Sequence, residues 1–227
     1  MRYRALLIDA DNTLFDFDAS ERRAIDLVIA RLGIADPQAH QVYHRINDSY
    51  WKALERREIT HAELSVNRFR DFLAHYRLAA DLRETARYYE AELTREAVLY
   101  PGALQTVAEI SRHMPVAIVT NGISSVQHAR FDSSPIRPYV SALVISEELG
   151  AEKPDPAILF AALEQLGGIP VEAALMIGDS LSSDIPAANR AGVDAYWYNP
   201  KRLARPEHLK IKGELRDIRD AVRIACG

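Results

Sequence analysis

The segment Leu6–Asp18 reads LLIDADNTLFDFD, an apolar run that leads into four aspartates, Asp9, Asp11, Asp16 and Asp18. Carboxylates packed this closely raise each other's pKa and repel, so the arrangement costs stability unless a cation lies between them. The pattern therefore indicates a cation-binding site at the end of a buried strand.

Similar short apolar segments recur along the chain, and their pattern predicts the fold class. The apolar runs are continuous rather than alternating, which is typical of parallel strands covered on both faces. Helical patterns separate them, and this alternation predicts an α/β fold with a doubly wound parallel sheet. The predicted strands are 3–9, 115–121, 141–146, 173–179 and 193–199, and the predicted helices are 102–113, 124–132, 156–167, 184–191 and 214–225.

One long segment breaks the alternation. Residues 16–95 show only helical patterns, so we expect a separate lid-like helical unit inserted after the first strand, between 1–15 and 96–227. Capping-box patterns and breaker residues punctuate its helices. These are Asp18–Glu21, Thr60–Glu63, Gly33 and Pro37.

Composition excludes several classes of protein. Among 227 residues the single cysteine, Cys226, excludes an internal disulfide framework and fits a reducing compartment. The apolar runs are too short for a signal peptide or a membrane span. The formal charge is −4 and the basic residues are scattered, which argues against a nucleic-acid surface. We therefore expect a cytoplasmic globular protein that has neither a nucleic-acid polymer nor a membrane as its partner.

Polar residues fall where the predicted strands end. In open parallel sheets, ligands bind beyond the carboxyl ends of the strands. Taken singly, each candidate also fits a structural explanation, such as a turn, a helix cap or a solvated lysine. Their joint placement at one edge of one sheet predicts a functional site. The candidates are Asp9, Asp11, Thr120, Asn121, Lys153, Asp179 and Asp184.

These residue types suggest metal-assisted phosphoryl transfer. Asp9, Asp179 and Asp184, with a backbone carbonyl, form a ligand set that suits Mg²⁺. One carboxylate can attack phosphorus and form an aspartyl-phosphate, while a second protonates the leaving oxygen and later activates water. Thr120, a lysine and backbone N–H groups would hold the phosphate oxygens as charge spreads over them.

Four motifs resemble, in order, those of the haloacid-dehalogenase-like hydrolase superfamily. They are DADNT (9–13), VTNG (119–122), KP (153–154) and GDSLSSD (178–184). The resemblance implies a Rossmann-like core with a helical cap inserted after the first strand, and a Mg²⁺ cofactor. It also implies that Asp9 is the nucleophile and that Asp11 is the general acid/base, whose carbonyl faces the metal. By the same resemblance, Thr120 and Asn121 bind the phosphate, and Lys153 pairs with the nucleophile and the phosphate. Asp179 would bind the metal, and Asp184 would bind it directly or through water.

Longer segments narrow the resemblance to the pyrimidine 5′-nucleotidase branch. They include YWKALERREIT (50–60), VTNGISSVQHARF (119–131) and LVISEELGAEKPDPAIL (143–159). The resemblance implies a small-molecule substrate, a pyrimidine nucleoside monophosphate. A monomer and a homodimer are both open from the sequence.

The inserted helices hold candidate substrate contacts. Asn47, Tyr50, Trp51 and Leu54 are spaced to share one helical face. That face either forms the interior of the cap or, with Phe15 or Phe17 beside it, closes over the base of a nucleotide.

Three other functions remain open on the same residues. A sugar-phosphate or phosphoglycolate-type phosphatase, or a mutase, would share the catalytic set and differ in the cap. A 2-haloacid dehalogenase uses the nucleophilic aspartate without a metal, and Asp11 argues against it. A non-enzymatic phospho-acceptor is disfavoured by the long insertion and by the acid at Asp11.

Overall fold

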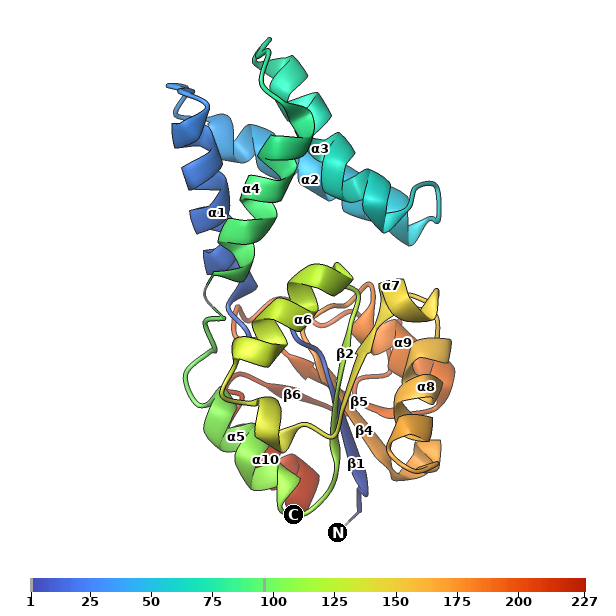
Figure 1. Cartoon of the computed structure of the whole chain (residues 1–227). Helices are drawn as coiled ribbons and strands as arrows, with labels where there is room; N and C mark the ends of the chain where they lie inside the picture. Colours follow the sequence, from blue (N-terminus) through green and yellow to red (C-terminus); the bar gives the residue numbers. More distant parts are fainter. Residues whose placement is uncertain (1, 96) are drawn as a thin grey trace. The chain divides into compact units, whose positions relative to one another are not determined.

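The five predicted apolar runs all lie in one six-stranded sheet in the computed structural model of the chain, which describes residues 2–95 and 97–227 (Figure 1). The order of the strands is β3-β2-β1-β4-β5-β6, and every neighbouring pair is parallel. The predicted α/β fold is therefore confirmed. The strands are β1 Ala5–Ile8, β2 Val116–Thr120, β3 Ala142–Ile145, β4 Ala174–Gly178, β5 Asp194–Tyr198 and β6 Gly213–Leu215.

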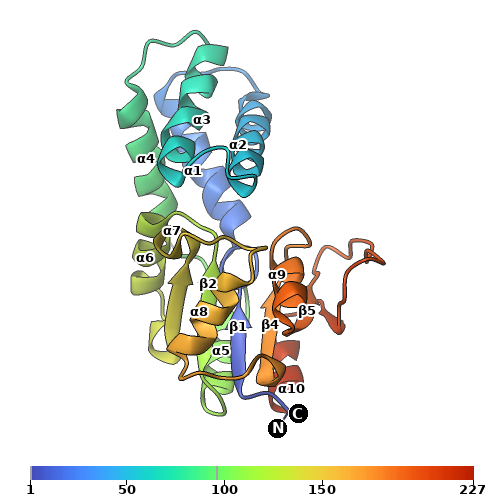
Figure 2. The same cartoon turned by 90° about the vertical axis from the view of Figure 1, so that its right-hand side faces the viewer.

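The centre of the sheet is apolar on both faces. Every residue of β1, β2 and β4 is buried, and Leu7 of β1 lies between Ala117 of β2 and Met176 of β4. Helices α8 and α9 cover one face and α5 and α10 the other, as Figure 2 shows. The helices of this unit are α5 Ala103–Ser111, α6 Ser124–Ser133, α7 Ser146–Leu149, α8 Ala157–Gln165, α9 Asp184–Ala191 and α10 Asp220–Cys226, with 3-10 turns at Arg137–Tyr139 and Val171–Ala173.

The last predicted helix is wrong at its start. Residues 213–215 form the edge strand β6, in which Gly213 pairs with Tyr196, and α10 begins only at Asp220. A strand of three residues that starts with glycine has no apolar run to mark it. Its position depends instead on β5, because a Cβ on Gly213 would lie 2.6 Å from Cε1 of Tyr196.

The inserted residues form a second compact unit, Phe17–Ala97, while the sheet unit holds the residues up to Asp16 and from Val98 onward. The limits differ by one and two residues from the predicted 16–95. Backbone N–H of Asp16 donates to the carbonyl of Val98 (2.9 Å), so the two crossing segments pair where they leave the sheet unit.

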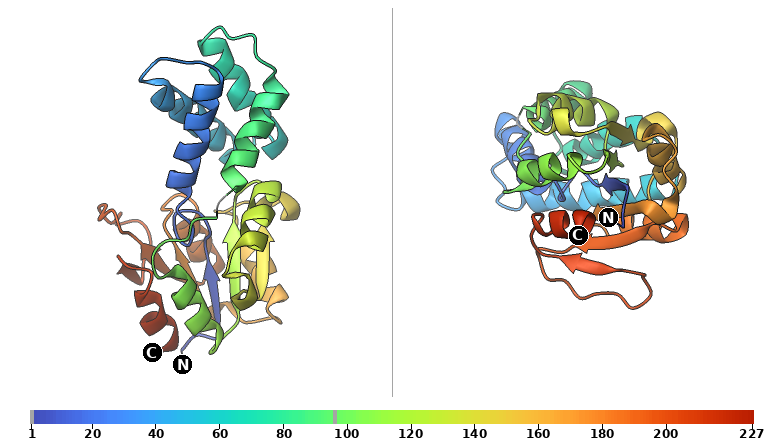
Figure 3. Two further views of the ribbon diagram at one scale, coloured as in Figure 1. Left: turned by 60° about the vertical axis from the view of Figure 1, so that its left-hand side comes forward. Right: turned by 90° about the horizontal axis from the view of Figure 1, so that it is seen from below.

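Four helices build the inserted unit, drawn from blue to green in Figure 3: α1 Phe17–Arg31, α2 Ala39–Glu55, α3 His61–His75 and α4 Leu82–Thr94. Helix α1 packs on α4 and α2 on α3. The interior is aromatic: the rings of Tyr43, Phe69 and Tyr89 lie with centroids 5.1–5.6 Å apart.

One of the two predicted capping boxes is present. Thr60 and Glu63 exchange both hydrogen bonds of the box at the start of α3. The Asp18–Glu21 box is wrong, because α1 already begins at Phe17 and the buried Glu21 instead accepts a hydrogen bond from Asn47. No helix in the described parts of the chain combines the length and the apolarity that crossing a bilayer requires.

Candidate active site

Polar side chains meet where the central strands end. Asp9 directly follows β1, Thr120 is the last residue of β2, and Asp179 directly follows β4. In the register of the sheet Ile8 pairs with both Ile118 and Ile177, so these carboxyl ends are level with one another. The sheet thus brings together residues that are up to 170 positions apart.

Lys153 is the buried cation of this cluster, and it comes from the segment between α7 and α8. Its Nζ donates to Oδ1 of Asp9 (2.5 Å), to Oδ1 of Asp184 (2.7 Å) and to the carbonyl of Val119 (2.7 Å). Three acceptors match the three donors of an ammonium group. Burial opposes the charge, yet the Asp184 and Asp9 carboxylates raise the pKa of Lys153 above its usual value. The lysine is therefore charged and fixed.

Asn121 holds the backbone of Lys153. Its Nδ2 donates to the carbonyl of Lys153 (2.7 Å), and its Oδ1 accepts from the N–H of the same residue (2.8 Å). Both ends of the amide are engaged in this way. Its predicted contact with phosphate stays a prediction, whereas its contact with the lysine segment is observed.

Glycine at the end of β4 makes room for Asp184. A Cβ on Gly178 would lie 2.2 Å from Oδ2 and 2.7 Å from Cβ of Asp184, the first residue of α9. The N–H of Ser180 donates to Oδ2 of Asp184 (2.9 Å), which fixes the carboxylate. The GDSLSSD motif therefore works as one turn that places two aspartates.

Three carboxylates form a cluster that suits a cation. Asp9, Asp179 and Asp184 each offer an oxygen, and these oxygens lie within 4.8 Å of one another. Burial, and then the charge of Asp184, raise the pKa of Asp9 well above its usual value and that of Asp179 to about 7. The cluster therefore resists full ionisation by itself. Hard oxygen ligands in this state fit Mg²⁺, whose charge offsets their repulsion.

Two neighbours fix Asp179. Oγ1 of the buried Thr13 donates to Oδ1 of Asp179 (3.4 Å), and Nε1 of Trp197 donates to its carbonyl (2.8 Å). Neither neighbour was among the predicted site residues. Thr13 could have been found, because it belongs to the DADNT motif, whereas Trp197 is marked in sequence only as part of a strand.

Asp11 contacts helix α6. Its Oδ2 accepts from Nε2 of Gln127 (2.7 Å), and its Oδ1 pairs with Nη1 of Arg130. Sequence reasoning missed both helix residues. A signal was present, since polar residues three positions apart on the helix after VTNG face the same side.

The residues predicted to contact the substrate differ in burial and in the unit to which they belong. Phe15 is buried in the sheet unit, where the Arg130 guanidinium lies 4.7 Å from its ring centroid, and Phe17 starts α1. Asn47 is buried within the helical unit, and Tyr50 donates to Asp71 (2.7 Å). Trp51 is half-buried.

Asn47 belongs to an interior polar network of the helical unit. Its Nδ2 donates to Oε1 of Glu21 (2.8 Å), and its Oδ1 accepts from Nη1 of Arg68 (3.0 Å). Leu54 is buried as well. These two residues therefore form part of the interior, and Tyr50 and Trp51 are the partly exposed members of the predicted face.

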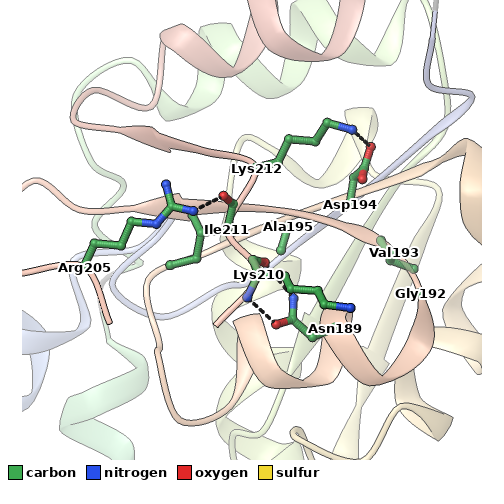
Figure 4. Close-up of a pocket in the computed structure, with 9 residues that line it drawn as sticks. All are labelled: Asn189, Gly192, Val193, Asp194, Ala195, Arg205, Lys210, Ile211 and Lys212. Carbon is green, nitrogen blue, oxygen red and sulfur yellow. Dashed lines mark hydrogen bonds and ion pairs between the residues drawn. The ribbon is translucent and has the colours of Figure 1, made fainter. Parts of the chain in front are cut away.

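A surface pocket of about 410 Å³ has none of the strand-end acids among its lining residues, which Figure 4 draws. It is lined by the start of β5 and by the segment before β6. Its polar groups bond to one another: Nζ of Lys212 donates to Asp194 (2.6 Å), and Asn189 exchanges two hydrogen bonds with the backbone of Lys210. These contacts hold the segment before β6 against the sheet, so the pocket has a structural explanation.

Known proteins are similar in sequence to this chain over most or all of its length. The pyrimidine 5′-nucleotidase PynA of Streptococcus pneumoniae is 37% identical over 205 residues, covering 89% of this chain and 86% of its own. The pyrimidine 5′-nucleotidase YjjG of Escherichia coli is 28% identical over 232 residues, covering 100% and 99%. The predicted resemblance to this branch is confirmed.

Solved structures agree with the fold. The magnesium-bound HAD-hydrolase YfnB of Bacillus subtilis superposes with a TM-score of 0.88 at 30% identity, covering 99% of both chains. An L-2-haloacid dehalogenase of Xanthobacter autotrophicus has a TM-score of 0.77 at 18% identity, covering 99% of both chains, which shows the shared fold. The family model described as haloacid dehalogenase-like hydrolase matches residues 3–192. This chain therefore belongs to the haloacid dehalogenase-like hydrolases and is an enzyme.

Proposed function

We propose that this enzyme is a Mg²⁺-dependent phosphomonoesterase that hydrolyses pyrimidine nucleoside 5′-monophosphates through an aspartyl-phosphate on Asp9. The observation that carries the proposal is the position of Asp9: a buried carboxylate at the end of the central strand, hydrogen-bonded to the buried Lys153. A carboxylate that accepts a hydrogen bond at one oxygen is fixed in place and can attack phosphorus with its other oxygen.

The chemical steps follow from the side chains at the strand ends. A carboxylate oxygen of Asp9 bonds to phosphorus while the bond from phosphorus to the ester oxygen breaks, and Asp11 gives that oxygen its proton. Water then attacks the aspartyl-phosphate, Asp11 takes a proton from it, and inorganic phosphate leaves. Lys153 and Thr120 stabilise the phosphoryl oxygens as charge spreads over them.

The metal would be held by the carboxylates of Asp9, Asp179 and Asp184 and by the carbonyl of Asp11. Bound there, Mg²⁺ supplies positive charge that offsets the acids and the transferring phosphoryl group. We expect Ca²⁺ to inhibit, because its longer bonds and looser coordination misplace nucleophile and phosphate.

The substrate class rests on the 37% identity to PynA and the 28% identity to YjjG, both of them pyrimidine 5′-nucleotidases. Binding energy from the base can favour a closed catalytic state that a simple sugar phosphate does not reach. Tyr50 and Trp51 are the candidate side chains for contact with the base.

A comparison of kcat/KM for dTMP, dGMP and glucose 6-phosphate in Mg²⁺ tests the proposal. We expect dTMP to be the best substrate and excess chelator to abolish turnover, with Asp9→Asn as the inactive control. Equal values for all three esters would contradict base recognition, and a preference for glucose 6-phosphate would favour a sugar phosphatase. Full activity in excess chelator would contradict the proposed requirement for Mg²⁺.

A further inference from the structure

Helix α6 clamps the carboxylate of Asp11 from both sides. Nε2 of Gln127 donates to Oδ2 at 2.7 Å, and Nη1 of Arg130 forms an ion pair with Oδ1. Gln127 is 3% exposed and Arg130 is fully buried, so the two donors stay in place rather than exchanging with water. A carboxylate held through both oxygens has a fixed plane.

The arginine is itself held in place. Its guanidinium carbon lies 4.7 Å from the centroid of the buried Phe15 ring. The turn after β1 brings that ring there, because the N–H of Phe15 donates to the carbonyl of Ala10 (2.9 Å) and the N–H of Asn12 donates to that of Phe15 (2.8 Å). The loop that carries Asp11 therefore also supplies the surface on which Arg130 stacks.

The VTNG motif makes room for the glutamine. A Cβ on Gly122 would lie 2.0 Å from Nε2 and 2.7 Å from Cδ of Gln127. The glycine is therefore needed for space, since any larger residue would displace the amide that bonds to Asp11. One residue of the phosphate-binding segment thus sets the position of the acid/base.

We propose that Gln127 and Arg130 are positioning residues that orient the Asp11 carboxylate for proton transfer. The inference rests on the proposed function, because it assumes that Asp11 serves the leaving oxygen and the attacking water. General acid–base catalysis contributes about 10²–10⁴-fold, and a displacement of about 1 Å at a reacting group costs about 10²-fold. Loss of either clamp residue should therefore slow the steps that use Asp11 and leave the others nearly unchanged.

An aryl phosphate separates those steps. p-Nitrophenolate leaves without a proton, so phosphorylation of Asp9 does not need Asp11, whereas hydrolysis of the aspartyl-phosphate does. In stopped flow with p-nitrophenyl phosphate and Mg²⁺, Gln127→Leu and Arg130→Leu should release a burst of nearly one nitrophenolate per enzyme. The steady rate after the burst should be about 10²-fold below that of the parent. Hydrolysis of dTMP, whose leaving group needs the proton, should already be slow in the first turnover.

Matched variants separate positioning from folding. Arg137→Ala removes an exposed arginine just after the same helix, paired with Asp132, and should behave as the parent. Arg130→Lys should recover part of the steady rate, and Gly122→Ala should resemble Gln127→Leu. In an Asp11→Asn background, Gln127→Leu should cause no further loss, because the group that it positions is already gone.

The outcomes are distinct. A burst and a steady rate that fall together, parent-like or higher activity of the clamp variants, or additive losses in the Asp11→Asn background would each overturn the positioning role. A parent enzyme that hydrolyses no phosphate ester would instead overturn the proposed function. If Arg130→Leu does not fold, Gln127→Leu and Gly122→Ala decide the result.

Discussion

The acids at the strand ends should make the metal-free protein less stable as pH rises. Burial and the charge of Asp184 raise the pKa of Asp179 from 3.8 to about 7. In the unfolded chain the same carboxyl loses its proton near its ordinary pKa. Between about pH 4 and pH 7 the folded protein therefore retains a proton that the unfolded chain has released, and the free energy of unfolding falls with rising pH.

The expected size follows from the pKa difference of Asp179. Of the difference between the folded and unfolded pKa of Asp179, about two pH units lie between pH 5 and pH 7. The free energy of unfolding should therefore fall by about 3 kcal/mol between pH 5 and pH 8. For a protein of this length 1 kcal/mol shifts Tm by about 2–4 °C. In chelator, Tm should therefore fall by about 6–12 °C across this range, and saturating Mg²⁺ should remove most of that fall by stabilising the ionised cluster.

Thermal melts at pH 5, 6, 7 and 8 measure this dependence. Asp179→Asn should lose the part of the slope that Asp179 contributes, because its side chain does not titrate, while the raised pKa of Asp9 keeps some dependence on pH. Asp132→Asn removes an exposed carboxylate of the sheet unit and should keep the slope of the parent. An equal loss of Tm in the parent and in Asp179→Asn between pH 5 and pH 8 would refute the titration of Asp179, and so would an equal increase in Tm of both with Mg²⁺.

Further variants probe the same cluster. Asp9→Asn should lower kcat at least about 10³-fold with Tm largely preserved, because the nucleophile is lost while the asparagine oxygen can still accept the hydrogen bond of Lys153; residual turnover within tenfold of the parent would remove Asp9 from that role. Lys153→Met should lower the free energy of unfolding in metal-free urea titrations by about 3–5 kcal/mol, since two buried carboxylates lose their cation, and Asp184→Asn in the same chain should restore part of it. Gly178→Ala should displace Asp184 and reduce the increase in Tm that Mg²⁺ gives, and an unchanged increase would argue against the close contact at that glycine.

The sequence predicted the sheet and the strand-end residues because both follow local rules. Continuous apolar runs mark buried parallel strands, and parallel strands bring their carboxyl ends to one edge. Asp9, Lys153 and Asp184 accordingly meet at hydrogen-bond distance although they come from three separate segments. The end of a strand places Asp9, whereas Lys153 and Asp184 come from the segments that follow β3 and β4.

The features that were missed depend on contacts between segments. Strand β6 exists because β5 offers an edge to pair with, and its three residues show no pattern of their own. The Asp18–Glu21 pattern fails for a related reason: Glu21 bonds to Asn47 of another helix rather than to its own helix start. The spacing of Gln127 and Arg130 places them on one face of a helix, but only the fold shows that this face meets Asp11.

The interior network of the helical unit limits which residues can read a base. Both polar ends of the Asn47 amide are engaged, with Glu21 and with Arg68, and all three residues are buried. Breaking either hydrogen bond to reach a nucleotide would leave a buried charged partner unsatisfied, at a cost of about 1–3 kcal/mol or more. A hydrogen bond from Asn47 to the edge of a base would be at most as strong as the one that it replaces. Such an exchange would therefore add little selectivity among bases. Tyr50 and Trp51, which are partly exposed, therefore remain the predicted contacts with a base, whereas Asn47 belongs to the interior packing of the helical unit.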